Sequence, residues 1–163
     1  MDIIEILGNN LKNKDFLGAF AITGYKALWV LDECLDKVQP HELYELILNF
    51  YSNTEIRSKR LKKYILLAKD CKPKGYKLDD NISIDNQGYV KVYCSSCNIK
   101  EQISWTISKE IAAKFQIRHE AMKRNSYMYE GRIEAENIIA YLNNREEKEI
   151  VQLNSVVDIM QLN

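Results

Sequence analysis

The chain has 163 residues, of which 46% are hydrophobic and 28% charged, and its 23 basic residues balance its 23 acidic ones. These values fit an ordinary globular protein of one large domain or two small ones, with little room for disordered linkers. No apolar run reaches membrane-spanning length and Met1 does not open a basic signal peptide. The sequence therefore excludes a membrane-spanning protein and predicts a cytoplasmic one.

The charges are distributed unevenly along this neutral chain. Residues 1–56 carry nine acidic and four basic side chains, whereas residues 57–77 carry nine basic side chains and one acidic one. Residues 106–145 carry seven bases and five acids, and the tail after them is acidic. The net charge of zero thus hides two basic zones. The distribution of charge along the chain says more about binding partners than the net charge does.

Apolar spacing predicts four helices in the first 70 residues, over residues 1–12, 15–38, 41–51 and 55–70. Asn13 is the expected cap of the second helix, and Pro40 suits the first turn of the third. Gly18 and Gly24 weaken the second helix unless a neighbour packs closely against them. Short connections predict a compact helical bundle over residues 1–70, which we interpret as a module for oligomerisation or partner binding.

Basic side chains cover most of the fourth helix. With nine bases and one acid between residues 57 and 77, ion pairs within the helix cannot neutralise them. Either the acidic N-terminal helices, in the same molecule or across an oligomer, or nucleic-acid phosphate must lie opposite. We favour phosphate, which makes Lys59, Arg60 and Lys63 candidate DNA contacts.

Residues 71–105 form the predicted β region. Period-2 alternation predicts a hairpin of residues 82–84 and 89–93 around a turn at residues 85–88, and a third strand over residues 102–107. The spacing of Cys94 and Cys97 is that of a zinc knuckle, in which a tight turn directs two thiolates at one ion. Cys71 is the natural third ligand, and Cys34, His119 or a solvent group would have to be the fourth. Unligated thiols in a reducing compartment explain the same cysteines equally well.

Residues 106–124 predict two short helices around a tight connection. Ser108 stands at the expected N-cap, the turn is expected at Gln116–Ile117, and a small residue, Ala112, allows the helices to cross closely. The apolar core of this motif would contain Ile111, Ala112, Phe115, Ile117 and Met122. Its second helix would place basic and polar side chains on its outer face: Arg118, His119, Glu120, Lys123 and Arg124. Such a helix can enter the major groove of DNA, and the alternative is a helical hairpin without a nucleic-acid role.

A short wing follows in the prediction, with strands on either side of Glu130–Gly131 and Arg132 just after the turn. The order of helix, turn, basic helix, wing, Gly131-Arg132-Ile133, acidic helix start and Ala140-Tyr141-Leu142 resembles the excisionase and MerR-type winged helix-turn-helix. The Arg118–His119 pair more faintly resembles prophage regulators of the Rha type. The resemblance implies a winged helix-turn-helix over residues 106–145, DNA as partner and a phage or mobile-element origin.

The sequence as a whole predicts an α+β protein, mainly α with a small β region. It combines a helical bundle over residues 1–70, a β-hairpin with a CxxC turn over residues 71–105, the winged helix-turn-helix, and a closing segment over residues 146–163. We interpret it as a small DNA-binding regulatory or accessory protein with a candidate structural zinc and a capacity to form homodimers. The competing interpretation is a protein-interaction module, such as an immunity protein, inhibitor or polymerase-associated factor, whose winged helix is only scaffold. No nucleophile elbow or phosphate loop is present, so we expect no enzyme.

Overall fold

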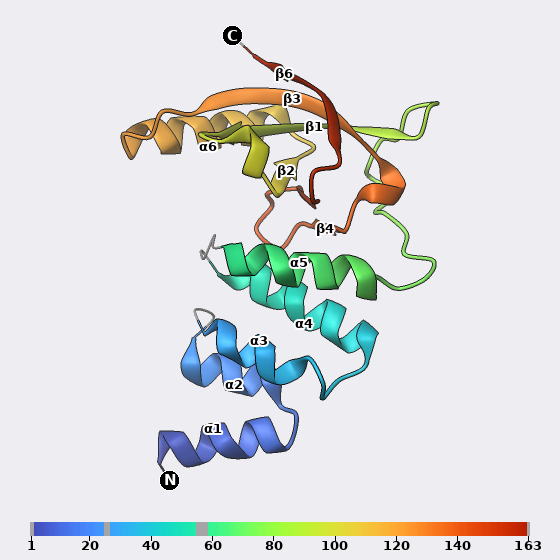
Figure 1. Ribbon diagram of the computed structural model, residues 1–163. Coiled ribbons are helices and arrows are strands. Elements are labelled where there is room, and N and C mark those ends of the chain that lie inside the picture. The colour runs from blue at the N-terminus through green and yellow to red at the C-terminus, as the bar shows by residue number, and fades with distance from the viewer. Residues whose placement is uncertain (1, 25–26, 55–58, 163) are drawn as a thin grey trace. The chain divides into compact units, whose positions relative to one another are not determined.

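The computed structural model describes residues 2–24, 27–54 and 59–162, and it belongs to the mixed α+β class, as predicted. The chain forms two compact units, residues 1–76 and residues 77–163. The first is helical, and the second is a six-stranded antiparallel sheet with one long helix (Figure 1). Within the described residues, no helix is both long and apolar enough to cross a membrane.

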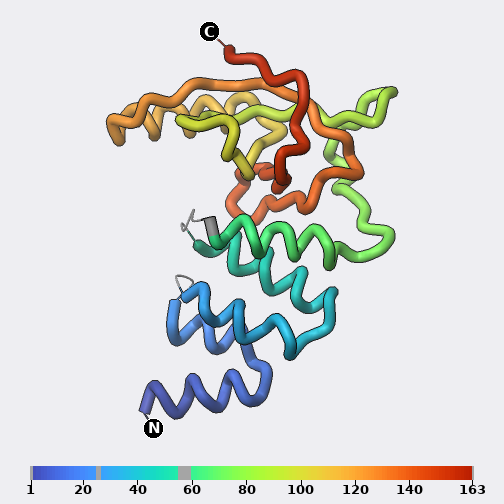
Figure 2. Tube along the Cα trace, viewed as in Figure 1, coloured from blue at the N-terminus to red at the C-terminus, as the bar shows by residue number. Residues whose placement is uncertain are grey.

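Helices that follow one another along the chain pack against one another in the first unit. They are α1 (Ile3–Lys12), α2 (Phe16–Thr23), α3 (Leu28–Cys34), α4 (Pro40–Asn53) and α5 (Lys59–Cys71). Figure 2 follows this succession from the blue N-terminus to the green end of α5. The start expected for the last helix, residues 55–58, lies outside the described residues.

The single helix predicted over residues 15–38 is wrong, because the chain leaves the helical conformation after Thr23. Gly24 adopts φ 73° there, a left-handed value that glycine reaches without the steric cost other residues meet. The N-cap is also two residues later than Asn13, since the Asp15 carboxylate accepts a hydrogen bond from the Gly18 amide at 3.0 Å. A Cβ at Gly18 would collide with the Asp15 side chain, which explains the glycine.

The core of the first unit is made by large side chains from α2 to α5. Phe20 and Phe50 are completely buried, with ring centroids 5.3 Å apart, and Tyr51 and Tyr64 are buried with them. The start of α4 at Pro40 is as predicted, and a capping box holds it: the Glu42 carboxylate accepts from the Gln39 amide at 2.8 Å. An apolar stripe and a good cap together fix this helix.

The second unit is built on a sheet with strand order β4-β5-β2-β1-β3-β6. Its strands are β1 (Tyr89–Ser96), β2 (Ser104–Thr106), β3 (Tyr127–Glu134), β4 (Ala140–Leu142), β5 (Glu149–Val151) and β6 (Val156–Gln161). Two short 3-10 helices, η1 (Ile99–Glu101) and η2 (Ala135–Asn137), connect strands, and α6 (Lys109–Ala121) lies between β2 and β3 in sequence. The helix packs against β1, β3 and β2.

The predicted hairpin is half right. Residues 89–93 do lie in a strand, but residues 82–84 form none, and β1 pairs instead with β3, from Tyr89 opposite Glu134 to Ser96 opposite Tyr127. The Asp85 carboxylate holds the preceding turn, because it accepts from the Gln87 and Tyr89 amides at 2.8 and 2.9 Å. Cys94 to Ser96 therefore lie within a strand and form no CxxC turn.

The predicted wing is also wrong, since Glu130 and Gly131 continue β3 without a turn. Gly131 allows a close approach of β6: a Cβ there would lie 2.5 Å from Val156 Cγ1 and 3.2 Å from the Val157 carbonyl oxygen. The tail, predicted only as a closing segment, forms strands β5 and β6. Residues from the predicted segments 71–105, 106–145 and 146–163 thus share one sheet.

Candidate nucleic-acid interface

One uninterrupted helix, α6, occupies the segment predicted as helix-turn-helix. The start is as expected, because Ser108 is the N-cap and its hydroxyl accepts from the Ile111 amide at 3.4 Å. The expected turn at Gln116–Ile117 is wrong: both residues lie inside the helix, and Ile117 is 67% exposed where a core position was predicted. Neither residue is a helix breaker, so nothing in the local chemistry interrupts the backbone hydrogen bonds.

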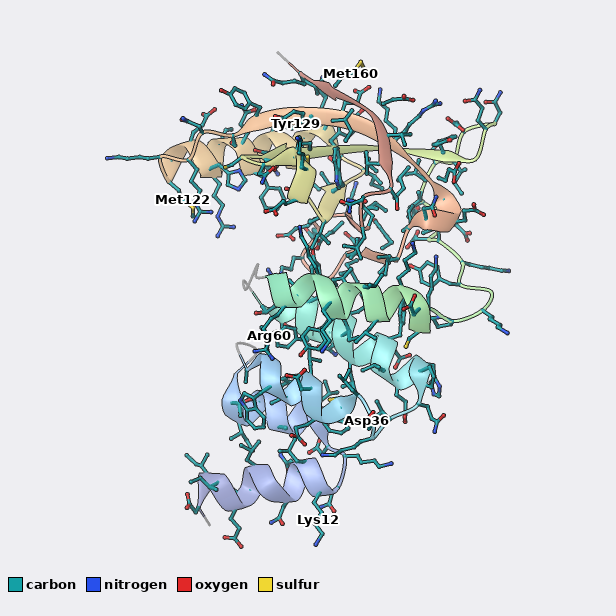
Figure 3. The ribbon with its side chains drawn as sticks, viewed as in Figure 1. Lys12, Asp36, Arg60, Met122, Tyr129 and Met160 are labelled. Atoms are coloured by element: carbon teal, nitrogen blue, oxygen red, sulfur yellow. The ribbon has the colours of Figure 1, made fainter. Side chains whose placement is uncertain are left out.

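The C-terminal end of α6 has a defined backbone cap. The Arg124 amide donates to the His119 carbonyl at 2.9 Å, and the Lys123 amide donates to the Glu120 carbonyl at 2.8 Å. These two hydrogen bonds form a Schellman motif. Lys123 occupies its left-handed position, with φ 56°. Met122 is 49% exposed at this end of the helix, so its predicted burial beneath the basic face is wrong (Figure 3).

A buried polar cluster attaches this end of α6 to the sheet. The Ser95 hydroxyl of β1 lies 3.1 Å from His119 Nδ1 and 3.1 Å from the Ser126 hydroxyl, and both serines are buried. The cluster fixes the ring of His119 and hence the helix turn that carries its neighbours. Sequence reasoning missed Ser95 and Ser126, because single serines in or beside strands carry no periodic signal.

Three basic side chains lie at this end of α6, close in sequence to His119. Arg118, Lys123 and Arg124 are exposed, and within the part of the chain that the structure describes none of them forms an ion pair. Burial is the main cause that holds the pKa of His119 below its ordinary value. The positive charges of Arg124 and Arg118 lower this pKa further. Glu120, the remaining predicted contact on this helix, is exposed beside them.

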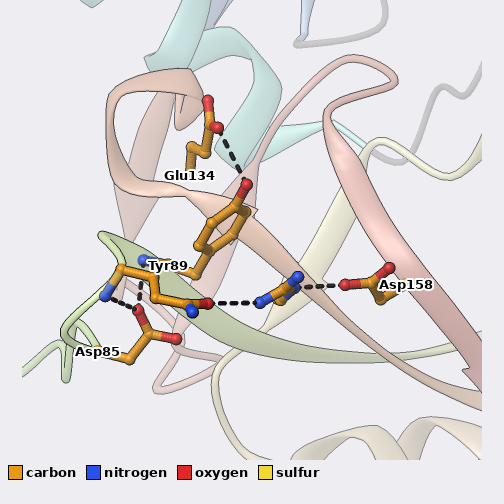
Figure 4. Close-up of polar contacts among 6 residues, drawn as sticks. Asp85, Tyr89, Glu134 and Asp158 are labelled. Atoms are coloured by element: carbon orange, nitrogen blue, oxygen red, sulfur yellow. Dashed lines mark hydrogen bonds and ion pairs between the residues drawn. The ribbon is translucent and has the colours of Figure 1, made fainter.

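Arg132, also predicted to touch DNA, is engaged within the sheet. Its guanidinium pairs with Asp158, donates to Gln87 at 3.1 Å and lies 4.4 Å from the centre of the Tyr89 ring (Figure 4). The Tyr89 hydroxyl in turn donates to Glu134 at 3.0 Å. This network ties β1, β3 and β6 together, so the charge of Arg132 is balanced by its own unit.

The basic helix α5 is partly neutralised as well. Arg60 Nη2 lies 2.7 Å from Asp32 Oδ2, Lys63 Nζ lies 4.0 Å from Asp32 Oδ1, and the Tyr64 hydroxyl donates to the same carboxylate. Of the two partners expected for this helix, the structure thus shows an acidic side chain of α3. The side chain of Lys59 lies outside the described residues. Asp32 was not singled out as the partner, because it lies close in sequence to Glu33 and Asp36 and the three together resemble a solvated acidic surface.

The cysteines have contrasting surroundings. Cys94 points into the core of the second unit, where burial raises the pKa of its thiol to about 12, while Cys97 is exposed. Cys34 is buried in the first unit and donates to the Val30 carbonyl, in keeping with a core role. Cys71 belongs to the first unit and is half-buried. Among the described residues, no group of three or more His, Cys, Asp or Glu side chains could hold a metal ion.

These surroundings predict how the thiols react. In the native protein a thiol reagent should modify Cys97 at once, whereas Cys94 and Cys34 should react only on unfolding, because a buried thiol rarely ionises. Mass spectrometry of the labelled peptides, with and without a chelator, measures this. About one equivalent of zinc in the purified protein, with Cys94 and Cys71 becoming reactive in chelator, would instead establish the metal site.

Comparison with known proteins adds no family: no family model, curated protein or solved structure matches the chain.

Proposed function

We propose that the protein is a small DNA-binding protein of regulatory or accessory type, and that it holds DNA through the basic end of α6. The observation that supports this is the exposure of Arg118, Lys123 and Arg124 without an ionic partner in the described chain. Arg60 and Arg132, two of the other predicted DNA contacts, are by contrast paired with acids of their own unit. Unmatched cations fixed on one helix end are suited to bind phosphate.

The mode of binding differs from that of a recognition helix. Helix α6 packs against three strands, and its basic end can reach the phosphate backbone. We therefore propose contact through this end and not insertion of the whole helix into a groove. A helix C-terminus carries only about half a negative charge, which three full positive charges outweigh. We therefore expect affinity that depends little on DNA sequence.

Glu120 distinguishes backbone contact from base contact. Beside a phosphate its carboxylate is repulsive, so Glu120→Gln should raise affinity for all duplexes by a few fold. If Glu120 instead accepts a hydrogen bond from cytosine, the same change should lower affinity for particular sequences alone. Binding of the variant to a panel of duplexes measures the sign.

A titration of random duplex DNA across a salt series tests the proposal. Three phosphate contacts predict a slope of log affinity against log salt of about −3. A protein that binds no duplex even at low salt is not a DNA-binding protein of this kind.

His119 should make binding dependent on pH. Its pKa is depressed in the free protein, so the ring is largely neutral near pH 7, and a phosphate placed beside it would raise that pKa. Binding would then take up a proton, and affinity should increase as the pH falls below about 7, by at most about tenfold per unit. His119→Gln should abolish this dependence, and His41→Gln, on α4, is the matched control. A pH profile that survives in His119→Gln removes the ring from the interface.

The second candidate, a protein-interaction module, is favoured by strand β6. It lies at the edge of the sheet, and its Val157, Ile159 and Met160 are 43%, 42% and 57% exposed. Edge strands with apolar side chains readily accept another strand. Absence of DNA binding, together with loss of a protein partner in a Met160→Lys variant, would support this function.

A further inference from the structure

Helix α1 ends the succession of helices in the first unit and leaves apolar surface uncovered. Its main contacts are with α2, and none of its residues is buried. Ile4 is 76% exposed and Ile3 66%. Where helices stack in succession, the terminal one needs a polar outer face to remain in water. Figure 1 shows α1 at the end of this succession, and it exposes two adjacent isoleucines there.

Gly8 marks the point where such a neighbour could approach. It lies near the middle of α1, on the exposed side, one turn after Ile4 and one turn before Leu11. A Cβ at Gly8 would meet nothing within 4 Å, so the packing of this unit does not require a glycine there. Glycine within a helix lowers helix stability relative to alanine, whereas it lets the backbone of a crossing helix come close.

The charges of α1 indicate the direction of that neighbour. Glu5 lies in the first turn and Lys12 in the last, and within the described residues neither forms an ion pair. Two copies of α1 placed antiparallel would bring Glu5 of each beside Lys12 of the other, twice in one interface. A parallel arrangement would place like charges together. The helix is thus complementary to an inverted copy of itself.

We propose that α1 pairs antiparallel with α1 of a second copy of this chain, about a two-fold axis close to Gly8. In this arrangement Ile4 packs against Leu11 of the partner on both sides of the axis, and each Glu5 pairs with a Lys12. Such an interface is isologous and closes on itself as a dimer. It is independent of DNA binding.

Two charge reversals test the pairing directly. Glu5→Lys and Lys12→Glu should each weaken the dimer, by roughly tenfold, because each creates two repulsive pairs. An equimolar mixture of the two variants should recover the affinity of the unaltered chain, since both cross-pairs are then of opposite charge. Native mass spectrometry distinguishes the heterodimer by mass. A single variant that dimerises as well as the unaltered chain, or a mixture that fails to recover, overturns the antiparallel pairing.

The close approach at Gly8 has its own test. Gly8→Ala should raise the helical stability of the monomer, yet it should weaken the dimer in a dilution series by sedimentation. Ile4→Glu should abolish the dimer while leaving the helical circular dichroism of the chain unchanged. Met160→Lys on β6 is the control that should leave the dimer intact. A chain that is monomeric at every concentration, or a dimer broken by Met160→Lys but not by Ile4→Glu, overturns the proposal.

Discussion

The combined variant Arg118→Ala, Lys123→Gly, Arg124→Ala should lose most of its affinity for duplex DNA and about three units of salt slope, one for each phosphate contact removed. Glycine is the right replacement for Lys123, because that residue occupies the left-handed position of the Schellman motif at φ 56°. The helix end should therefore persist without its charge. Binding to random duplex across a salt series gives both affinity and slope.

The matched control removes two cations that already have an acidic partner. Arg60→Ala with Lys63→Ala should leave the salt slope nearly unchanged, since both side chains lie beside Asp32 in the structure. The proposal fails if the control flattens the slope and the α6 variant does not, because α5 would then be the phosphate-binding element.

Gly131→Val should destabilise the second unit by about 3 kcal/mol, the upper part of the usual range for overpacking. Even a single methyl group at this position would lie 2.5 Å from Val156 Cγ1 and 3.2 Å from a backbone oxygen of β6, so the strand must move away. Trp105, buried in this unit, reports unfolding by fluorescence in urea once the exposed Trp29 of the first unit is replaced by Phe.

The steric origin of that loss can be isolated with Val156. If the two side chains compete for the same space, Val156→Ala combined with Gly131→Val should cost less than the sum of the separate changes. Strict additivity would mean that glycine is needed for a reason other than the approach of β6.

Local signals in the sequence predicted several elements well. Ser108 caps α6 and Pro40 opens α4 as expected, because caps and proline act through the backbone of their own turn. Ala112 is buried as expected, since a small residue on the inner face of a helix serves close packing in many arrangements. The mixed α+β class followed from such elements without any knowledge of their pairing.

The pairing itself is long-range, and there the sequence was misleading. The partner of β1 is β3, reached only after α6, and the apolar residues of the tail have helical spacing but occupy strands β5 and β6. Gly131 was predicted to lie in a turn, but it is needed for the close approach of β6. The sequence alone does not distinguish these two uses of glycine. Among the candidate contacts, Arg118, Lys123 and Arg124 share one exposed helix end, whereas Arg60, Lys63 and Arg132 are paired with acids that are distant in sequence.

Acetylation of lysines in the presence and absence of duplex DNA, read by mass spectrometry, tests the central claim most directly. Lys123 and Lys63 are both exposed, so both should be modified in the free protein. Saturating DNA should protect Lys123 on α6 and leave the modification of Lys63 on α5 unchanged. Protection of Lys63 with full modification of Lys123 in the bound complex would contradict the basic end of α6 as the DNA-binding site.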